Sequence, residues 1–269
     1  MKVLYFGDVY AKAGRLAVRY AMDKLIGPHE IDFVIVNGEN VTHGNGILPE
    51  MAMDFLEHGV DAITTGNHAW DQRQIIPLMN TSPRIIRPAN YPDIPSFKTP
   101  GRGSTVLESR RRPGLRLGLI QVMGRVFMQG MLDCPFRVGA AEADRMDDLG
   151  IHAILVDFHG EASSEKQAFA HYMDGRVSAV VGSHSHVQTA DERVLPGGTA
   201  AITDVGMCGC FDSVIGVKKE LSIEKFLTQR PVRYEPAEGP GGYGAVVIDI
   251  DEQSGRARSI LRLRETAVT

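Results

Sequence analysis

The feature that most constrains this chain is the alternation of short apolar runs with longer amphipathic stretches. Runs rich in Val, Ile, Leu and Phe are typical of buried strands, and stretches with helical spacing separate many of them. We expect strands over residues 2–6, 33–36, 62–65, 115–122, 153–158, 179–181, 200–203, 244–250 and 256–264. We expect helices over residues 14–26, 48–58, 139–149 and 164–174. This order predicts an α/β fold with much parallel sheet.

Length and composition limit the classes of protein that this chain can represent. Its 269 residues are 43% hydrophobic and 23% charged, which is typical of a globular protein, and we expect a single domain over residues 1–269. The net charge of −4 gives no support for nucleic-acid or membrane binding, and no apolar run approaches the ~18 residues of a membrane span. Three cysteines provide no disulfide framework, so we expect a cytoplasmic protein, with a homo-oligomer left open.

Polar residues that can bind metals follow five of the expected strands. They lie at positions 7–8 (Gly-Asp), 37–40 (Asn-Gly-Glu-Asn), 66–68 (Gly-Asn-His), 159–161 (His-Gly-Glu) and 182–186 (Gly-Ser-His-Ser-His). Ligands of open α/β sheets bind outside the carboxyl ends of the strands. Each residue alone has an ordinary explanation, such as a helix cap or a turn, but one shared site explains all five positions.

The donors at these positions are too many for one metal ion. They comprise two carboxylates, two amides and three imidazoles: Asp8, Glu39, Asn40, Asn67, His159, His184 and His186. Two ions that share a carboxylate would use such a set, and oxygen and nitrogen donors without thiolates suit Fe, Mn, Co or Zn. Two ions about 3.5–4 Å apart form the clamp that hydrolyses phosphate esters.

Three histidines in these motifs carry different expectations. His184 and His186 would share one face of an extended strand, so they could bind one ion or two adjacent ions. Asn67 and His68 would point to opposite sides, which leaves His68 free to protonate the leaving oxygen. We therefore predict His68 as the general acid of the reaction.

Together these motifs resemble those of the calcineurin-like binuclear metallophosphoesterases, and more narrowly of their bacterial YmdB-like branch. The narrower resemblance rests on four segments: "NGEN" at 37–40, "GNHAWD" at 66–71, "FHGEASSEK" at 158–166 and "GSHSHVQTAD" at 182–191. It extends from "FGDVYAKAGR" at 6–15 to "DVGMCG" at 204–209. It implies a sandwich of mixed β-sheets flanked by helices, with the metal site at the carboxyl ends of the strands.

The resemblance also implies a division of labour among the predicted ligands. Asp8, Asn40 and His186 would serve the first ion, Glu39 would bridge, and Asn67, His159 and His184 would serve the second. Iron is the first candidate metal, with manganese or zinc as alternatives. The implied substrates are small phosphodiesters, including 2′,3′-cyclic nucleotides, attacked by a metal-bridging hydroxide.

The chain departs from the superfamily pattern at three positions. Tyr10 stands where the first motif usually has a histidine, and Glu39 stands where an aspartate usually bridges. Ala69 stands where an acidic residue often follows Gly-Asn-His, and the next carboxylate is Asp71. The sequence leaves open whether Asp71 supports His68.

Two other functions are compatible with the same residues. A phosphomonoesterase or nucleotidase would need further cationic groups, for which Arg125 and Arg137 near the ends of the long loop 123–138 are candidates. A regulator could bind a nucleotide without hydrolysing it. The presence of His68 argues against the regulator, because binding alone requires no acid for the leaving group.

Overall fold

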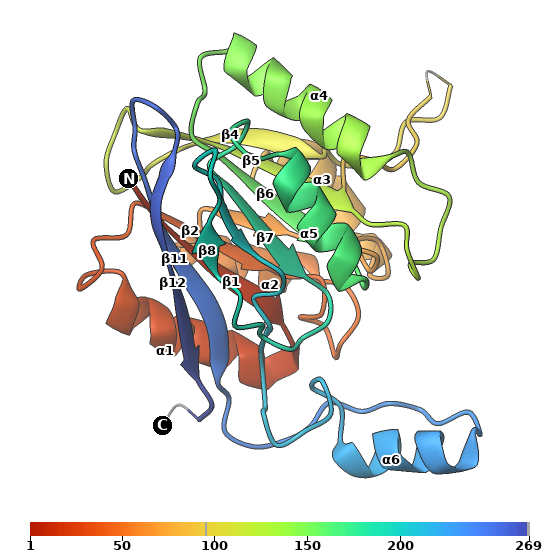
Figure 1. The fold of residues 1–269 in the computed structure, drawn as a ribbon. Helices are drawn as coiled ribbons and strands as arrows, with labels where there is room; N and C mark the ends of the chain where they lie inside the picture. The colour runs from red at the N-terminus through yellow and green to blue at the C-terminus, as the bar shows by residue number, and fades with distance from the viewer. Residues whose placement is uncertain (95, 268–269) are drawn as a thin grey trace.

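The computed structural model describes residues 1–94 and 96–267, and within them two β-sheets of six strands each form the centre of the molecule (Figure 1). The first sheet has the order β12 (Ala257–Glu265), β11 (Tyr243–Ile250), β1 (Lys2–Val9), β2 (Phe33–Asn37) and β3 (Ala62–Thr64), and β10 (Met207–Cys208) pairs with the end of β1. Strands β1, β2 and β3 are parallel, as are β1 and β10, whereas β11 and β12 form an antiparallel hairpin whose strand β11 also pairs antiparallel with β1.

The second sheet is also mixed. Its order is β4 (Ser104–Glu108), β5 (Arg116–Met123), β6 (Ile154–His159), β7 (Ala179–Ser183), β9 (Ala200–Ile202) and β8 (Arg193–Val194). The four central strands are parallel, and the two edge strands run antiparallel to their neighbours. Parallel strands place their carboxyl ends at one edge, so this sheet delivers the ends of β6 and β7 to the same side of the molecule.

Within the described residues, seven helical segments accompany the two sheets, and four of them cover the outer faces. The seven are α1 (Ala11–Leu25), α2 (Pro49–Glu57), the 3-10 helix η1 (Arg73–Ile75), α3 (Ile76–Thr81), α4 (Pro135–Asp148), α5 (Ser163–Tyr172) and α6 (Lys219–Thr228). Apolar residues of α1 and α2 pack on the first sheet, and those of α4 and α5 pack on the second (Figure 1). The layers are therefore helix, sheet, sheet and helix.

Burial on both faces explains the composition of the central strands. Tyr5 and Phe33 point into the core between the sheets, where they join Leu119 and Leu155 of the second sheet. Their neighbours Leu4 and Val34 point to the helices instead. Because both faces of these strands are buried, the strands appear in the sequence as continuous apolar runs and not as alternating patterns.

The observed elements confirm the predicted fold class and extend it. Every expected strand and helix overlaps an observed one, but the prediction lacks β4, β8, β10, η1, α3 and α6. The strands β8 and β10 have only two residues each, too few to produce a periodic pattern. Helix α4 begins at Pro135, inside the expected loop 123–138, because proline is well suited to the first position of a helix.

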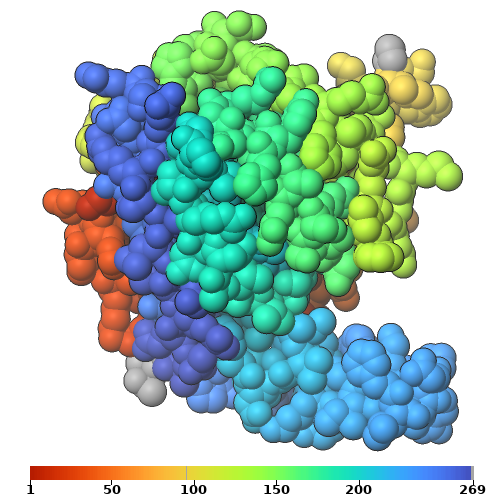
Figure 2. All heavy atoms as spheres, in the orientation of Figure 1, coloured from red at the N-terminus to blue at the C-terminus, as the bar shows by residue number. Residues whose placement is uncertain are grey.

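One segment projects from the sandwich. Helix α6 lies away from both sheets, at the lower right of Figure 1, and the same segment forms a blue lobe in Figure 2. Within α6 only Ser222 is buried, while the side chain of Phe226 is 71% exposed. Across residues 1–94 and 96–267, no helix combines the length and the hydropathy that crossing a membrane requires.

Candidate metal centre

The seven predicted ligands lie at the carboxyl ends of strands from both sheets. Asp8 is near the end of β1 and His159 is the last residue of β6, while His184 directly follows β7. Glu39 and Asn40 follow β2, and Asn67 follows β3 by a short turn. All of the residues except His184 and Asn67 are buried, so the polar groups meet in a region that is largely closed to water.

Four donor atoms converge around His159. Its Nε2 atom lies 3.0 Å from Oδ1 of Asn67, 3.1 Å from Oε1 of Glu39 and 3.1 Å from Nδ1 of His184. Donor atoms of Glu39, His159 and His184 all lie within 4.8 Å of one another. Donors at these separations can surround a single metal ion.

A second group of donors lies around Asp8. Oδ1 of Asn40 is 3.2 Å from Nε2 of His186. Oδ2 of Asp8 accepts a hydrogen bond from the backbone N–H of His184 at 3.1 Å, whereas its buried Oδ1 atom has no hydrogen-bond partner among the described residues. A buried carboxylate oxygen without a partner is costly, and a bound cation would remove that cost.

The electrostatics of the two groups are linked. Burial raises the pKa of Asp8 to about 6, although the imidazoles of His186 and His159 oppose the rise. Burial also raises the pKa of Glu39, but the charge of His159 and its hydrogen bond have the larger opposite effect. They lower the pKa of Glu39 to about 2. Glu39 in turn raises the pKa of Asp8, so the carboxylates of the two groups affect each other.

The imidazoles of the centre differ in charge. Burial lowers the pKa of His159, but Glu39 and Asp8 outweigh it and raise that pKa to about 9. Burial and the positive charge of His159 lower the pKa of His184 to about 3. A proton on His159 therefore occupies the place beside Glu39 that a metal cation would take, and metal binding would release it.

Each imidazole is oriented through its other ring nitrogen. Nδ1 of His159 contacts the hydroxyl of Ser183 at 2.8 Å, and Nδ1 of His186 donates to the carbonyl of Ile215 at 2.8 Å. Nε2 of His184 lies 3.2 Å from a carboxylate oxygen of Glu161. Partners of this kind are typical of histidines that bind metals, because they select the tautomer and hold the ring.

Backbone strain accompanies this arrangement. Strand β7 ends at Ser183, and His184 and His186 both have positive φ angles, of 100° and 64°. Side chains rarely adopt such angles, and they occur most often at functional sites. Neither histidine is in the strand, so the two rings do not share one strand face, and they point into different donor groups.

His68 lies outside both donor groups. Its Nδ1 atom is 2.7 Å from Oδ2 of Asp71, and its side chain is partly exposed. Its backbone N–H donates to Oε2 of Glu39 at 3.3 Å. Asn67 thus faces the donor group around His159, while the ring of His68 points away from that group, toward the partly exposed carboxylate of Asp71.

A profile of the family described as YmdB-like protein matches residues 4–263. The chain belongs to the YmdB-like family. It is 43% identical over 266 residues to a Bacillus subtilis (strain 168) protein named 2′,3′-cyclic-nucleotide 2′-phosphodiesterase, and the match covers 98% of this chain and 96% of that protein.

Solved structures support the same assignment of family and fold. A hypothetical protein from Thermus thermophilus is 40% identical with a TM-score of 0.88, and both chains are covered completely. A structure described as a novel phosphatase from Mycoplasma pneumoniae is 33% identical and has a TM-score of 0.90. The match covers 98% of this chain and 93% of that chain. The Haemophilus influenzae NAD nucleotidase, at 14% identity and a TM-score of 0.63, shares the fold, which is that of the calcineurin-like phosphoesterases.

A buried network behind the YmdB-like centre was missed in the sequence. Asp157 accepts hydrogen bonds from the hydroxyls of Tyr5 and Ser183, each at 2.7 Å. Because Ser183 donates to Asp157, it can accept from Nδ1–H of His159, which leaves Nε2 of His159 facing the donor group. The sequence signal that could have revealed this network is Asp157 itself, a carboxylate inside the apolar run 153–158.

The two arginines considered as extra phosphate-binding groups stay at the surface. Arg125 and Arg137 are both exposed, and neither guanidinium forms an ion pair within residues 1–94 and 96–267. The backbone N–H of Arg125 donates instead to the carboxylate of Glu165 at 3.0 Å. The loop is thus tied to α5 through its backbone, and the arginines add no observed contact to the centre.

Gly66 provides a direct test of the centre. A Cβ atom at this position would lie 2.1 Å from Oε2 of Glu39 and 2.5 Å from Nε2 of His159. We expect Gly66→Ala to displace Glu39 and to lower the bound metal per chain, measured by elemental analysis. Gly27→Ala is the matched control, because nothing lies within 4 Å of its Cβ position. Normal metal content in Gly66→Ala would contradict the centre.

Proposed function

We propose that this chain is a metal-dependent phosphodiesterase, built as one metallophosphoesterase domain that binds two transition-metal ions. The observation that carries the proposal is the convergence of buried oxygen and nitrogen donors from both sheets, with Oδ1 of Asp8 lacking a partner among the described residues. Thiolates are absent from the set, and mixed oxygen and nitrogen donors suit Fe, Mn, Co or Zn. Among these, the resemblance to the YmdB-like family makes iron the first candidate, with manganese or zinc as alternatives. The ions, when bound, would supply a nucleophilic water at neutral pH and neutralise charge on the phosphate.

The two donor groups support a division of the ligands between the ions. Asn67, His159 and His184 would hold one ion, since their donor atoms lie about the same point. Asp8, Asn40 and His186 would hold the other. Glu39 would bridge, because it contacts His159 directly and precedes Asn40 in the chain.

The remaining chemistry belongs to His68. Its position beside the donors, but outside them, supports a role in protonating the leaving oxygen of the ester. The contact of Nδ1 with Asp71 leaves Nε2 as the atom that would carry this proton. Asp71 would hold the ring and select the tautomer through its contact with Nδ1.

The substrate class is proposed from the relatives. The Bacillus subtilis protein, 43% identical, is named for the hydrolysis of 2′,3′-cyclic nucleotides. A Mycoplasma pneumoniae relative, 36% identical over 253 residues, is named a putative phosphatase/phosphodiesterase. We propose small phosphodiesters, including 2′,3′-cyclic nucleotides, as the substrates of this chain.

Rates on matched esters test this function. We expect the metal-loaded protein to hydrolyse adenosine 2′,3′-cyclic phosphate and aryl phosphodiesters faster than the corresponding monoesters, measured as kcat/KM. Elemental analysis of the same sample should give two ions per chain. A preference for monoesters across several leaving groups would assign the chain to the phosphomonoesterases instead.

Removal of the bridge should affect both ions. We expect Glu39→Ala to lose both metal ions, whereas His186→Ala should lose one, because its ring belongs to one donor group only. Metal content per chain, with Tm to verify folding, is the measurement. If Glu39→Ala lost one ion and kept the other bound normally, Glu39 would not be a bridge.

Substitution of His68 should separate chemistry from metal binding. We expect His68→Ala to keep its metal content and to lose about 100- to 10,000-fold in kcat for diesters with alkoxide leaving groups. The loss should be smaller for nitrophenolate, which leaves well without a proton. Asp71→Asn should show an intermediate loss with the same dependence. Loss of metal, or equal losses for both leaving groups when chemistry limits the rate, would refute the acid role.

A further inference from the structure

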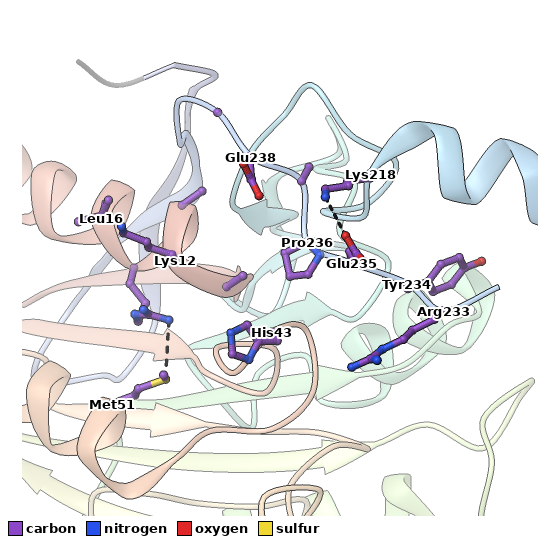
Figure 3. Close-up of a pocket in the computed structure, with 15 residues that line it drawn as sticks. Lys12, Leu16, His43, Met51, Lys218, Arg233, Tyr234, Glu235, Pro236 and Glu238 are labelled. Carbon is purple, nitrogen blue, oxygen red and sulfur yellow. Dashed lines mark hydrogen bonds and ion pairs between the residues drawn. The ribbon is translucent and has the colours of Figure 1, made fainter.

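A large pocket lies between α1 and the segment that leads into β11 (Figure 3). Its volume is about 1020 Å³, at the upper end of the range of about 300–1,000 Å³ typical of small-molecule sites. Lys12 and Leu16 of α1 lie on one side, Arg233 and Tyr234 lie on the other, and His43 lies between them (Figure 3). None of the seven proposed metal ligands lines this pocket.

The pocket shares a wall with the metal centre. Asn40, whose Oδ1 atom faces His186, donates through Nδ2 to the carbonyl of Gly44 at 2.9 Å. The backbone carbonyl of Asn40 accepts a hydrogen bond from the N–H of Ala11 at 3.1 Å. Ala11 and His43, the residue before Gly44, line the pocket. A molecule in the pocket would therefore lie one layer of residues from the proposed metal ligands.

Positive charge dominates the lining. The lining contains four cationic residues and two acidic ones. The cationic residues are Lys12, Arg15, Lys218 and Arg233, and the acidic ones are Glu235 and Glu238. Lys218 is neutralised by Glu235 at 2.7 Å, whereas Lys12 and Arg233 form no ion pair within the part of the chain that the structure describes. Helix α1 also begins here without an acidic residue in its first turn, and its dipole adds positive potential. The pocket therefore favours an anion.

The lining also provides surfaces for a flat, partly apolar group. Tyr234 is 41% exposed, with Nζ of Lys225 4.8 Å from its ring centre, and Leu16, Met51 and Pro236 line the pocket with apolar atoms. Aromatic side chains stack on nucleobases, and lysine and arginine bind phosphate. A nucleotide combines both features, which neither a simple inorganic anion nor an apolar ligand does.

We propose that this pocket is a subsite for a 5′-phosphate of the substrate, so that the chain prefers 2′,3′-cyclic nucleotides that carry one. The 5′ oxygen leaves the ribose on the side away from the cyclic phosphate, so a 5′-phosphate extends away from the metal centre while the scissile ester stays there. This inference rests on the proposed phosphodiesterase function. Arg233 is the group that binds the 5′-phosphate, and Lys12 across the pocket adds positive potential.

Paired substrates test the subsite. We expect the metal-loaded wild-type protein to show about tenfold higher kcat/KM for adenosine 2′,3′-cyclic phosphate with a 5′-phosphate than without one. Arg233→Ala should remove about tenfold from the phosphorylated substrate and less than twofold from the other. Arg230→Ala is the matched control, since its guanidinium pairs with Glu224 at 3.1 Å outside the pocket. It should leave both values within twofold.

The outcomes separate the subsite from the enzyme activity. Equal kcat/KM for the two substrates, or an equal effect of Arg233→Ala on both, would overturn the subsite while the phosphodiesterase function stands. If the protein hydrolysed no phosphodiester, calorimetry would decide the subsite separately. Tighter binding of adenosine 3′,5′-bisphosphate than of adenosine 3′-phosphate, lost in Arg233→Ala but kept in Arg230→Ala, would support it. Equal binding of the two would overturn it.

Discussion

The buried contact between Glu39 and His159 is the interaction on which the rest of this structure depends. Glu39 follows β2 of one sheet and His159 ends β6 of the other, so their contact joins the two halves of the sandwich at the edge where the donors meet. Both side chains are almost fully buried, and charges are stable there only when they are paired. The contact therefore requires the sheets to align, and their alignment brings the other donors together.

The network behind this contact connects it to the core. Asp157 on β6 accepts from Tyr5 on β1 across the sheets, and through Ser183 it holds the ring of His159. Burial raises the pKa of Asp157, and hydrogen bonds from these hydroxyls oppose that rise. The same residues thus contribute to core packing and to the orientation of the donor that faces Glu39, so the scaffold and the centre cannot be varied independently.

The positive φ angles at His184 and His186 extend this reasoning to the loops. A straight continuation of β7 would send both rings to one side, but the left-handed turns direct one ring to His159 and the other to Asn40. Partners on separate elements, Glu161 and the carbonyl of Ile215, hold the two rings in place. Strain of this kind persists only where the surrounding contacts determine the conformation.

The sequence by itself determined the α/β class, the central strands and the positions of the seven donors, because buried parallel strands produce apolar runs and their ends are marked by glycine and polar residues. It also pointed to His68 as a residue apart from the donors. Only the tertiary structure decided that Asp71 contacts His68, that Asp157 and Ser183 orient His159, and that the segment before β11 faces α1 across a cationic pocket. These contacts join residues whose relation has no period or spacing in the chain, such as Tyr5 with Asp157, and they exist only because two sheets pack face to face.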